Sequence, residues 1–96
     1  SEITVAGEAA IEGFLSLDGE EVEALYLAAK ARVMGVGAAL IAAAQAARPR
    51  LSVWTFRANA GARRFYARNG FREVEATDGA GNEEKLPDVR LEWSRT

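Results

Sequence analysis

Seven consecutive residues constrain the fold most strongly, Arg32-Val33-Met34-Gly35-Val36-Gly37-Ala38, and they lie between a predicted strand and a predicted helix. Two glycines two positions apart let the backbone approach a ligand closely and turn its N–H groups outward. The helix that begins here adds the positive end of its dipole, and Arg32 adds a full charge. The segment therefore predicts a turn that binds a diphosphate. The alternative is a plain tight turn that serves only to pack the helix.

Two other phosphate-binding loops do not fit this segment. A dinucleotide fingerprint needs a third glycine, and the chain has Leu40 there. It also needs an acid about 20 residues further on, and no acid occurs between Lys30 and Arg72. A Walker loop needs Gly-Lys-Ser/Thr, which this sequence does not contain. What remains is the pattern Arg-x-x-Gly-x-Gly.

The charges of the 96-residue chain are segregated, although 12 basic and 14 acidic residues give a formal charge of only −2. Residues 1–29 carry seven acids and no base, whereas residues 30–72 carry nine bases and no acid. Residues 73–96 return to seven acids against three bases. The cationic middle is a typical place for an anionic ligand to bind.

The composition excludes several classes of protein. Without cysteine there is no disulfide framework and no thiolate chemistry, and without histidine there is no catalytic triad or imidazole-bound zinc. The longest apolar run, Val33 to Ala44, is shorter than the ~18–20 residues that span a bilayer. No charged-then-apolar leader opens the chain. We expect one soluble, cytoplasmic domain with no metal and no membrane or nucleic-acid partner.

Hydrophobic periodicity and turn signals predict six strands and two helices in the order β-β-β-α-β-α-β-β. The predicted strands are Ile3–Val5, Ala10–Leu17, Val22–Ala28, Leu51–Phe56, Phe71–Ala76 and Asp88–Trp93. The predicted helices are Gly35–Ala47 and the segment from Asn59 to Asn69, with Asn59 as the cap and Gly70 as the left-handed residue that ends it. A strand, a helix and a strand in succession imply a right-handed parallel crossover in an otherwise antiparallel sheet. The fold class is therefore α+β, with helices on the sheet faces.

The third predicted strand carries the most informative alternation. Its period of two places Val22, Ala24 and Tyr26 on one face, and the other face takes Glu21, Glu23, Leu25 and Leu27. Asp18-Gly19 precedes this strand and predicts a two-residue hairpin turn in which both residues tolerate positive φ.

The pattern Arg32-x-x-Gly35-x-Gly37 resembles motif A of the GNAT superfamily, the acyl-CoA-dependent N-acetyltransferases. A second signature, Asn59-x-x-Ala62-x-x-Phe65-Tyr66-x-x-x-Gly70-Phe71, resembles motif B of the same family. Leu25-Tyr26-Leu27 also resembles the family's strand before the phosphate loop. The resemblance covers roughly Ile11 to Trp93, which is nearly all of the chain.

This resemblance implies a GNAT-type fold and an N-acetyltransferase that moves acetyl from acetyl-CoA to a primary amine by direct attack. The acceptor would be a small-molecule or peptide amine. The family normally begins with a strand and two helices, and only Ser1–Ala10 precede the resemblance here. The chain is therefore expected to be a single, N-terminally truncated domain with an exposed apolar sheet face, open to self-association or to a missing N-terminal segment.

The resemblance also implies cofactor contacts for particular residues. Backbone groups of Leu25, Tyr26 and Leu27 would pair with the pantetheine arm, the N–H of Leu27 polarising the thioester. Asn59 would bond to the pantetheine, and Arg63 or Arg68 would meet the 3′-phosphate. The diphosphate would be held by the Arg32 side chain and by the backbone of Val33, Met34, Gly35, Val36, Gly37 and Ala38.

Two catalytic roles follow from the same resemblance. Tyr66 would give a proton to the departing thiolate, the alternative being a core aromatic at helical spacing. Glu21 or Glu23 would take the proton of the amine through water, the alternative being a pair of solvated acids. Family members often place a glutamate on the strand before motif B. This chain has no carboxylate there, and Trp54 is expected in the core or in the wall of the substrate pocket.

Two other functions stay open at this stage. A non-catalytic acyl-CoA-binding or assembly module would keep the fold without the chemistry. A polyanion-binding domain would use the cationic middle, with Arg57, Arg63, Arg64 and Arg68 on one surface.

Overall fold

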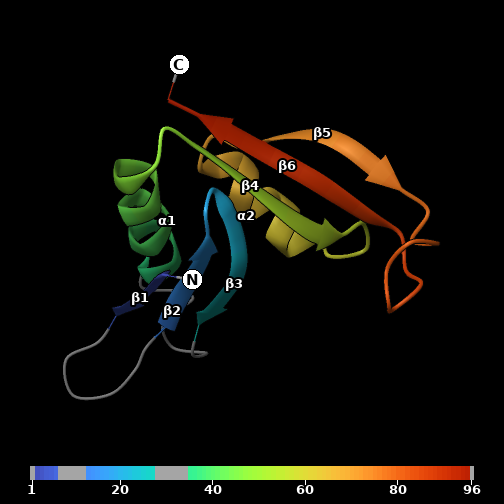
Figure 1. The fold of residues 1–96 in the computed structure, drawn as a ribbon, viewed down its shortest axis with the longest axis horizontal. Coiled ribbons are helices and arrows are strands. Elements are labelled where there is room, and N and C mark those ends of the chain that lie inside the picture. Colours follow the sequence, from blue (N-terminus) through green and yellow to red (C-terminus); the bar gives the residue numbers. More distant parts are fainter. Residues whose placement is uncertain (1, 7–12, 28–34, 96) are drawn as a thin grey trace.

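The structure, a computed structural model, describes residues 2–6, 13–27 and 35–95. Its elements follow the predicted order, and the α+β class is confirmed (Figure 1). The strands are β1 (Glu2–Ala6), β2 (Gly13–Asp18), β3 (Glu21–Leu27), β4 (Arg50–Phe56), β5 (Arg72–Thr77) and β6 (Asp88–Ser94). The helices are α1 (Val36–Ala47) and α2 (Ala60–Arg68).

One six-stranded sheet organises these elements, with the strand order β1-β2-β3-β4-β6-β5. Neighbouring strands are antiparallel except for β3 and β4, which are parallel and joined through α1. The predicted parallel crossover is therefore confirmed. Figure 1 shows α2 behind β4 and β6, and the Gln45 amide of α1 donates a hydrogen bond to the Asn69 carbonyl at the end of α2 (2.8 Å). Both helices thus cover the same face of the sheet.

The core lies between the helices and this inner face. Side chains from α1, α2 and five of the strands or their flanks form one cluster, in which Leu15, Ile41 and Leu51 are at most 1% exposed. Its buried members are Leu15, Leu17, Val22, Leu40, Ile41, Ala44, Leu51, Val53, Tyr66, Phe71, Val89 and Leu91.

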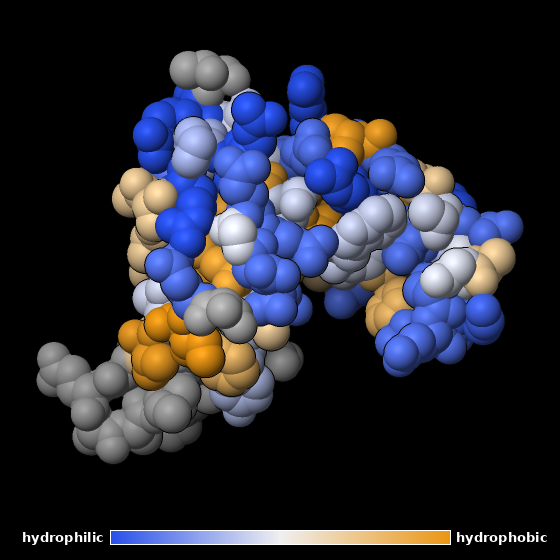
Figure 2. All heavy atoms as spheres, in the orientation of Figure 1, coloured by the Kyte–Doolittle hydropathy of each residue, from blue (hydrophilic) through white to orange (hydrophobic). Residues whose placement is uncertain are grey.

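The opposite, outer face of the sheet has no helix on it among the described residues. Ile3 and Val5 of β1 are 65% and 53% exposed, and Tyr26, Trp54 and Phe56 are exposed on β3 and β4. Figure 2 shows apolar side chains gathered over β1 and β2, while the surface over β4, β6 and β5 is mostly hydrophilic. The predicted exposure of an apolar sheet face is confirmed for this part of the chain.

The predicted faces of β3 are wrong on the N-terminal side of a bulge, at Glu21 and Val22. Ser16 pairs with Ala24 and Leu17 pairs with Val22, so Glu23 is an extra residue without a partner on β2. Such a β-bulge interrupts the period of two. Val22 therefore joins Leu25 and Leu27 on the inner face instead of lying opposite them.

The hairpin turn between β2 and β3 is also shifted from the prediction. Asp18 pairs with Glu21, so the two turn residues are Gly19 and Glu20, and only Gly19 has a positive φ (61°). A positive φ at the first turn residue alone is typical of a type II′ turn. The helix ends agree with the sequence, since the Asn59 side chain caps α2 and Gly70 follows it with φ 91°. Neither described helix is long and apolar enough to cross a membrane.

Candidate functional site

The two parallel strands at the centre of the sheet separate soon after they meet. Their one paired position is Glu21 with Ser52, where the Ser52 N–H donates to the Glu20 carbonyl (2.9 Å). Beyond this point β3 and β4 diverge into a V (Figure 1). The edge of β3 that faces β4 is therefore left without a ladder from Val22 to Leu27.

A cleft of about 680 Å³ occupies this opening. It brings together residues from β3, the start of α1, the middle of β4, and α2. Its lining residues are Val22, Glu23, Ala24, Leu25, Leu27, Gly35, Gly37, Ala38, Val53, Trp54, Thr55, Asn59, Gly61, Ala62, Phe65, Tyr66, Arg68 and Asn69.

Most of the predicted site residues that the structure describes line this cleft. Leu25, Leu27, Asn59, Tyr66 and Arg68 do so, as do Gly35, Gly37, Ala38 and Glu23. Three predicted residues lie outside its lining, namely Glu21, Tyr26 and Val36. The predicted Arg32, Val33 and Met34 contacts lie outside the described residues.

The N-terminus of α1 opens into the cleft without a side-chain cap. Gly35 holds the N-cap position in the left-handed region (φ 75°), and the first turn contains no acid. A Cβ atom added to Gly35 would meet none of the described residues within 4 Å, so they leave the space beside this backbone open. Free N–H groups and the positive end of the helix dipole make such a terminus suited to an anion.

Glycine is required at the second position of the motif, Gly37, for a different reason. Gly37 is buried, and an added Cβ would lie 2.9 Å from Leu27 Cδ1 and 3.1 Å from the Phe65 ring. Its small size therefore lets α1 pack closely against β3 and α2. Packing explains Gly37, whereas the left-handed turn beside open space explains Gly35.

Tyr66 lies between the core and the cleft. Its ring contacts those of Phe65 and Phe71, each with a centroid separation of 5.2 Å, and the residue is 6% exposed. Burial raises the pKa of Tyr66 to about 12. The Tyr66 hydroxyl makes no hydrogen bond with the described residues. Every fully buried polar side-chain atom among these residues has a partner, so the hydroxyl is not fully buried and is accessible from the cleft. Both roles expected for Tyr66, core aromatic and proton donor, are compatible with this position.

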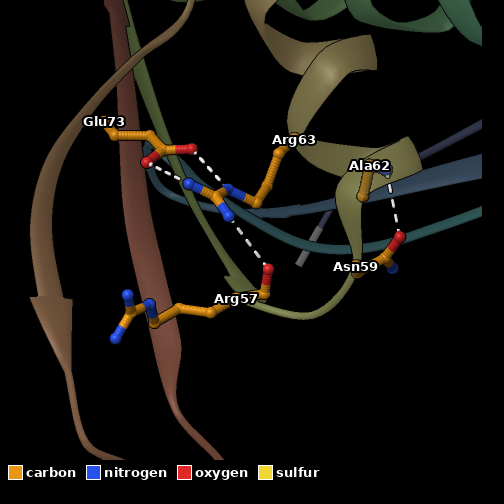
Figure 3. A network of polar contacts seen from close by, with 5 residues as sticks. All are labelled: Arg57, Asn59, Ala62, Arg63 and Glu73. Atoms are coloured by element: carbon orange, nitrogen blue, oxygen red, sulfur yellow. Dashed lines mark hydrogen bonds and ion pairs between the residues drawn. The ribbon is translucent and has the colours of Figure 1, made fainter.

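The loop before α2 fixes a second group of polar residues (Figure 3). Asn59 Oδ1 accepts a hydrogen bond from the Ala62 N–H (3.0 Å), which leaves the amide NH2 of Asn59 free to donate. Arg63 donates two hydrogen bonds to the Glu73 carboxylate (2.6 and 2.8 Å) and a third to the Arg57 carbonyl (2.9 Å). This pairing raises the pKa of Arg63 and lowers the pKa of Glu73. The hydrogen bonds of Arg63 are therefore used within the fold. Of the two predicted 3′-phosphate partners, Arg68 lines the cleft and Arg63 does not.

The two candidate bases differ in position. Glu23 lines the cleft, and its carboxylate accepts a hydrogen bond from the Ser16 hydroxyl (3.0 Å), whereas Glu21 lies where β3 and β4 still pair. Trp54 of β4 lines the cleft and is 39% exposed. Of its two expected positions, it therefore lies in a pocket wall and not in the core. Among the described residues, no three acids gather closely enough to hold a metal ion.

Sequence reasoning missed part of the cleft wall. Gly61, Ala62, Phe65 and Asn69 line the cleft along one side of α2. Their spacing along the helix was a usable signal, because residues three and four apart share a face.

A family model described as an acetyltransferase (GNAT) domain matches residues 1–73. The chain belongs to the GNAT acetyltransferase family. No curated protein gives a significant match to it.

Solved structures agree with this assignment. YjaB from Escherichia coli, in its apo form, is 26% identical with a TM-score of 0.84, over 95% of this chain and 63% of that one. A GNAT family acetyltransferase from Elizabethkingia anophelis with acetyl-CoA bound is 18% identical with a TM-score of 0.81, over 96% and 74%. A GCN5-related N-acetyltransferase from Rhodopseudomonas palustris is 25% identical with a TM-score of 0.77, over 96% and 60%. The chain thus spans less than two thirds of the length of YjaB and of the R. palustris protein.

Proposed function

We propose that this chain binds acetyl-CoA in the cleft between β3 and β4 and transfers its acetyl group to a primary amine. The observation that carries the proposal is the V-shaped opening of the two parallel strands in front of the uncapped N-terminus of α1. An extended arm can pair with the free edge of β3, while an anionic group meets the helix N-terminus. Membership of the GNAT family and the acetyl-CoA bound to the E. anophelis relative support the same ligand.

The binding roles follow from the positions of the residues. The N–H groups at the start of α1 would hold the diphosphate, with Gly35 leaving the space for it. Backbone groups of Leu25 and Leu27 would pair with the pantetheine arm, and the free amide NH2 of Asn59 would donate to it. Arg68 would meet the 3′-phosphate from the end of α2.

Bound acetyl-CoA supplies an activated thioester, and the residues of the cleft manage the protons. A protonated amine first gives one proton to Glu23, directly or through water, which frees its lone pair for attack on the carbonyl carbon. A carbon–nitrogen bond forms, the carbon–sulfur bond breaks, and the nitrogen loses its second proton. Tyr66 gives its hydroxyl proton to the leaving sulfur and regains one from the nitrogen. The net products are the amide, the free thiol of CoA and one proton in solution.

Titration calorimetry with acetyl-CoA tests the binding step, and Arg68 and Arg64 provide a matched pair on one helix. Arg68 lines the cleft and Arg64 is exposed outside it. We expect Arg68→Gln to weaken acetyl-CoA binding roughly 2- to 5-fold, the upper part of the range for one exposed ionic contact. Arg64→Gln is expected to change it less than about twofold. Absence of binding by the unmodified chain, or equal losses in both variants, would refute the proposed site.

A second candidate function is an acyl-CoA-binding module without transfer activity. It is favoured by one observation, that β4 presents Val53, Trp54 and Thr55 to the cleft and no carboxylate. A panel of primary amines separates the two functions. Acetylation of any amine above the rate of thioester hydrolysis supports the enzyme, and hydrolysis alone together with tight binding supports the module.

A further inference from the structure

We propose that Trp54 selects the acceptor, and that the preferred acceptor is a primary amine that carries an aromatic ring. The inference rests on the proposed function, because it names the substrate class of that same site. Its starting point is the place of Trp54 in the fold, at the edge of the cleft and on the face of the sheet opposite the helices.

The backbone of β4 places Trp54 beside the opening between the parallel strands. The Ser52 N–H points to β3, where it donates to the Glu20 carbonyl. Backbone groups of alternate residues in a strand point to the same edge, so the Trp54 N–H is the next one that points toward β3. Two residues span about 7 Å of a strand. Trp54 therefore lies close to the point where β3 and β4 separate.

The indole ring stands on the outer face of the sheet. Val53 is 4% exposed and Trp54 is 39% exposed, which is the alternation of a strand with one buried face. The pairing with β6 agrees, because Val53 lies opposite the buried Leu91 whereas Trp54 lies opposite Arg90. The indole thus flanks the opening on the side that faces away from α1 and α2.

The residues proposed to hold acetyl-CoA lie on the other side. Gly35 precedes α1, and Asn59 and Arg68 lie at the two ends of α2. Both helices cover the inner face of the sheet, and Figure 1 shows α2 behind β4. A cofactor held by these residues fills the cleft from the helix side. The amine then reaches the thioester from the outer face, past the Trp54 indole.

Aromatic rings also flank the opening on the side of β3. Tyr26 is 51% exposed, and its ring stacks with that of Phe14 across the strand pair, with centroids 5.6 Å apart. Leu25 and Leu27 pack against the core, so Tyr26 between them points to the outer face, as Trp54 does. The outer face therefore carries aromatic side chains on both strands that border the opening.

The Trp54 ring is available to a ligand. Among the described residues it makes no contact with another ring or with a cation. The Arg90 guanidinium across the strand pair forms an ion pair with Glu92 (2.7 Å). Aromatic rings prefer offset-stacked or edge-to-face partners. A primary amine with an aromatic ring can place its nitrogen in the opening and its ring against this indole.

Steady-state kinetics with phenethylamine and ethylamine test the inference, because the two amines share the reacting group and differ by the ring. The quantity compared is the ratio of their kcat/KM values in the unmodified chain, Trp54→Leu, Trp54→Phe and Phe56→Leu. Phe56→Leu is the matched control, because Phe56 is an exposed aromatic residue two positions further on the same face of β4 and lies outside the cleft lining.

We expect the unmodified chain to prefer phenethylamine roughly 10-fold or more, from burial of the ring and its pairing with the indole. Trp54→Leu should lower this ratio roughly 5- to 10-fold, and Trp54→Phe should keep most of it, because it keeps a ring. Phe56→Leu should change the ratio less than about twofold, as for a substitution away from the site. Calorimetry should give the same acetyl-CoA affinity in all variants within about twofold, because the indole and the cofactor residues lie on opposite faces.

Fluorescence provides a readout that needs no turnover. The chain has two tryptophans, so a Trp93→Phe variant reports Trp54 alone. Its emission in the presence of CoA should change on addition of phenethylamine and stay constant with ethylamine. An emission that responds to neither amine, or equally to both, would overturn the inference.

The kinetic outcomes separate the inference from the proposed function. Acetyl transfer to both amines with equal kcat/KM refutes the inference alone, as do equal changes of the ratio in Trp54→Leu and Phe56→Leu. A loss in Trp54→Leu that is the same for both amines also overturns it, because the ring is then not what Trp54 recognises. An unmodified chain that binds no acetyl-CoA, or that acetylates neither amine, refutes the proposed function and the inference with it.

Discussion

Replacing Tyr66 by phenylalanine should remove one source of instability at high pH. The folded protein raises the pKa of Tyr66 from 10.0 to about 12 by burying its ring. In the unfolded chain the phenol ionises near its ordinary value, so above pH 10 the unfolded state loses a proton that the folded state keeps. The free energy of unfolding therefore falls as the pH rises from about 10 to about 12. The Tyr66→Phe variant has no phenol proton at this position, so its free energy of unfolding does not include this loss.

The size of the effect follows from the two pKa values. At pH 11 a phenol of pKa 10.0 is mostly ionised, and one of pKa about 12 is mostly neutral. The difference amounts to about 1.4 kcal/mol of stability lost between pH 8 and pH 11. For a domain of about 100 residues this corresponds to a melting temperature lower by roughly 5–10 °C.

Urea unfolding of the unmodified chain and of Tyr66→Phe at pH 8 and pH 11 measures this loss. The unmodified chain should lose about 1.4 kcal/mol more than the variant between the two pH values. A difference spectrum of the two folded proteins near 295 nm reports the ionisation of Tyr66 itself. An equal loss in both proteins, or a Tyr66 phenolate that appears with a midpoint near pH 10, would refute the burial argument.

Four further outcomes are expected. Tyr66→Phe should lower kcat roughly 100-fold or more, as for loss of a general acid, with the acetyl-CoA affinity from calorimetry nearly unchanged; equal losses in both would make Tyr66 structural. Gly37→Ala should lower stability by about 1 kcal/mol in thermal unfolding, because overpacking against Leu27 and Phe65 exceeds the gain in helix propensity; a stabilised variant would contradict this packing. Asn59→Ala should cost about 1 kcal/mol of unfolding free energy through the lost cap of α2, and Asn59→Asp should keep most of it. Because Arg63 lowers the pKa of Glu73, this pair stabilises the fold above pH 4.5 and its contribution disappears as the pH falls through the lowered pKa; Glu73→Gln should flatten that part of the acid unfolding curve.

Local features of the fold could be predicted because neighbouring residues determine them. The cap at Asn59, the glycine after α2 and the glycine turn before α1 each depend on a few consecutive residues. The same holds for the family motifs, which combine a turn, a helix start and a helical face. For this reason the element order was predicted correctly, and most of the candidate cofactor residues that the structure describes line one cleft.

The faces of β3 and the choice between the two glutamates could not be predicted in the same way. A bulge arises when two strands of different residue count must pair, and nothing within β3 reveals the count on β2. The sequence alone therefore placed Val22 on the wrong face and gave Glu21 and Glu23 equal standing.

The amino-acid sequence by itself determined the order of elements, the glycine turn before α1 and the family, since these depend on residues close together in the chain. Only the tertiary structure decided where β3 and β4 separate, which glutamate lines the cleft, and that Arg68 lines it while Arg63 pairs with Glu73. Those properties depend on residues from different strands and helices that meet only after packing. Gly37 shows the same division. The sequence places a residue without a side chain at this position, and only the fold shows that Leu27 and Phe65 leave no room for one.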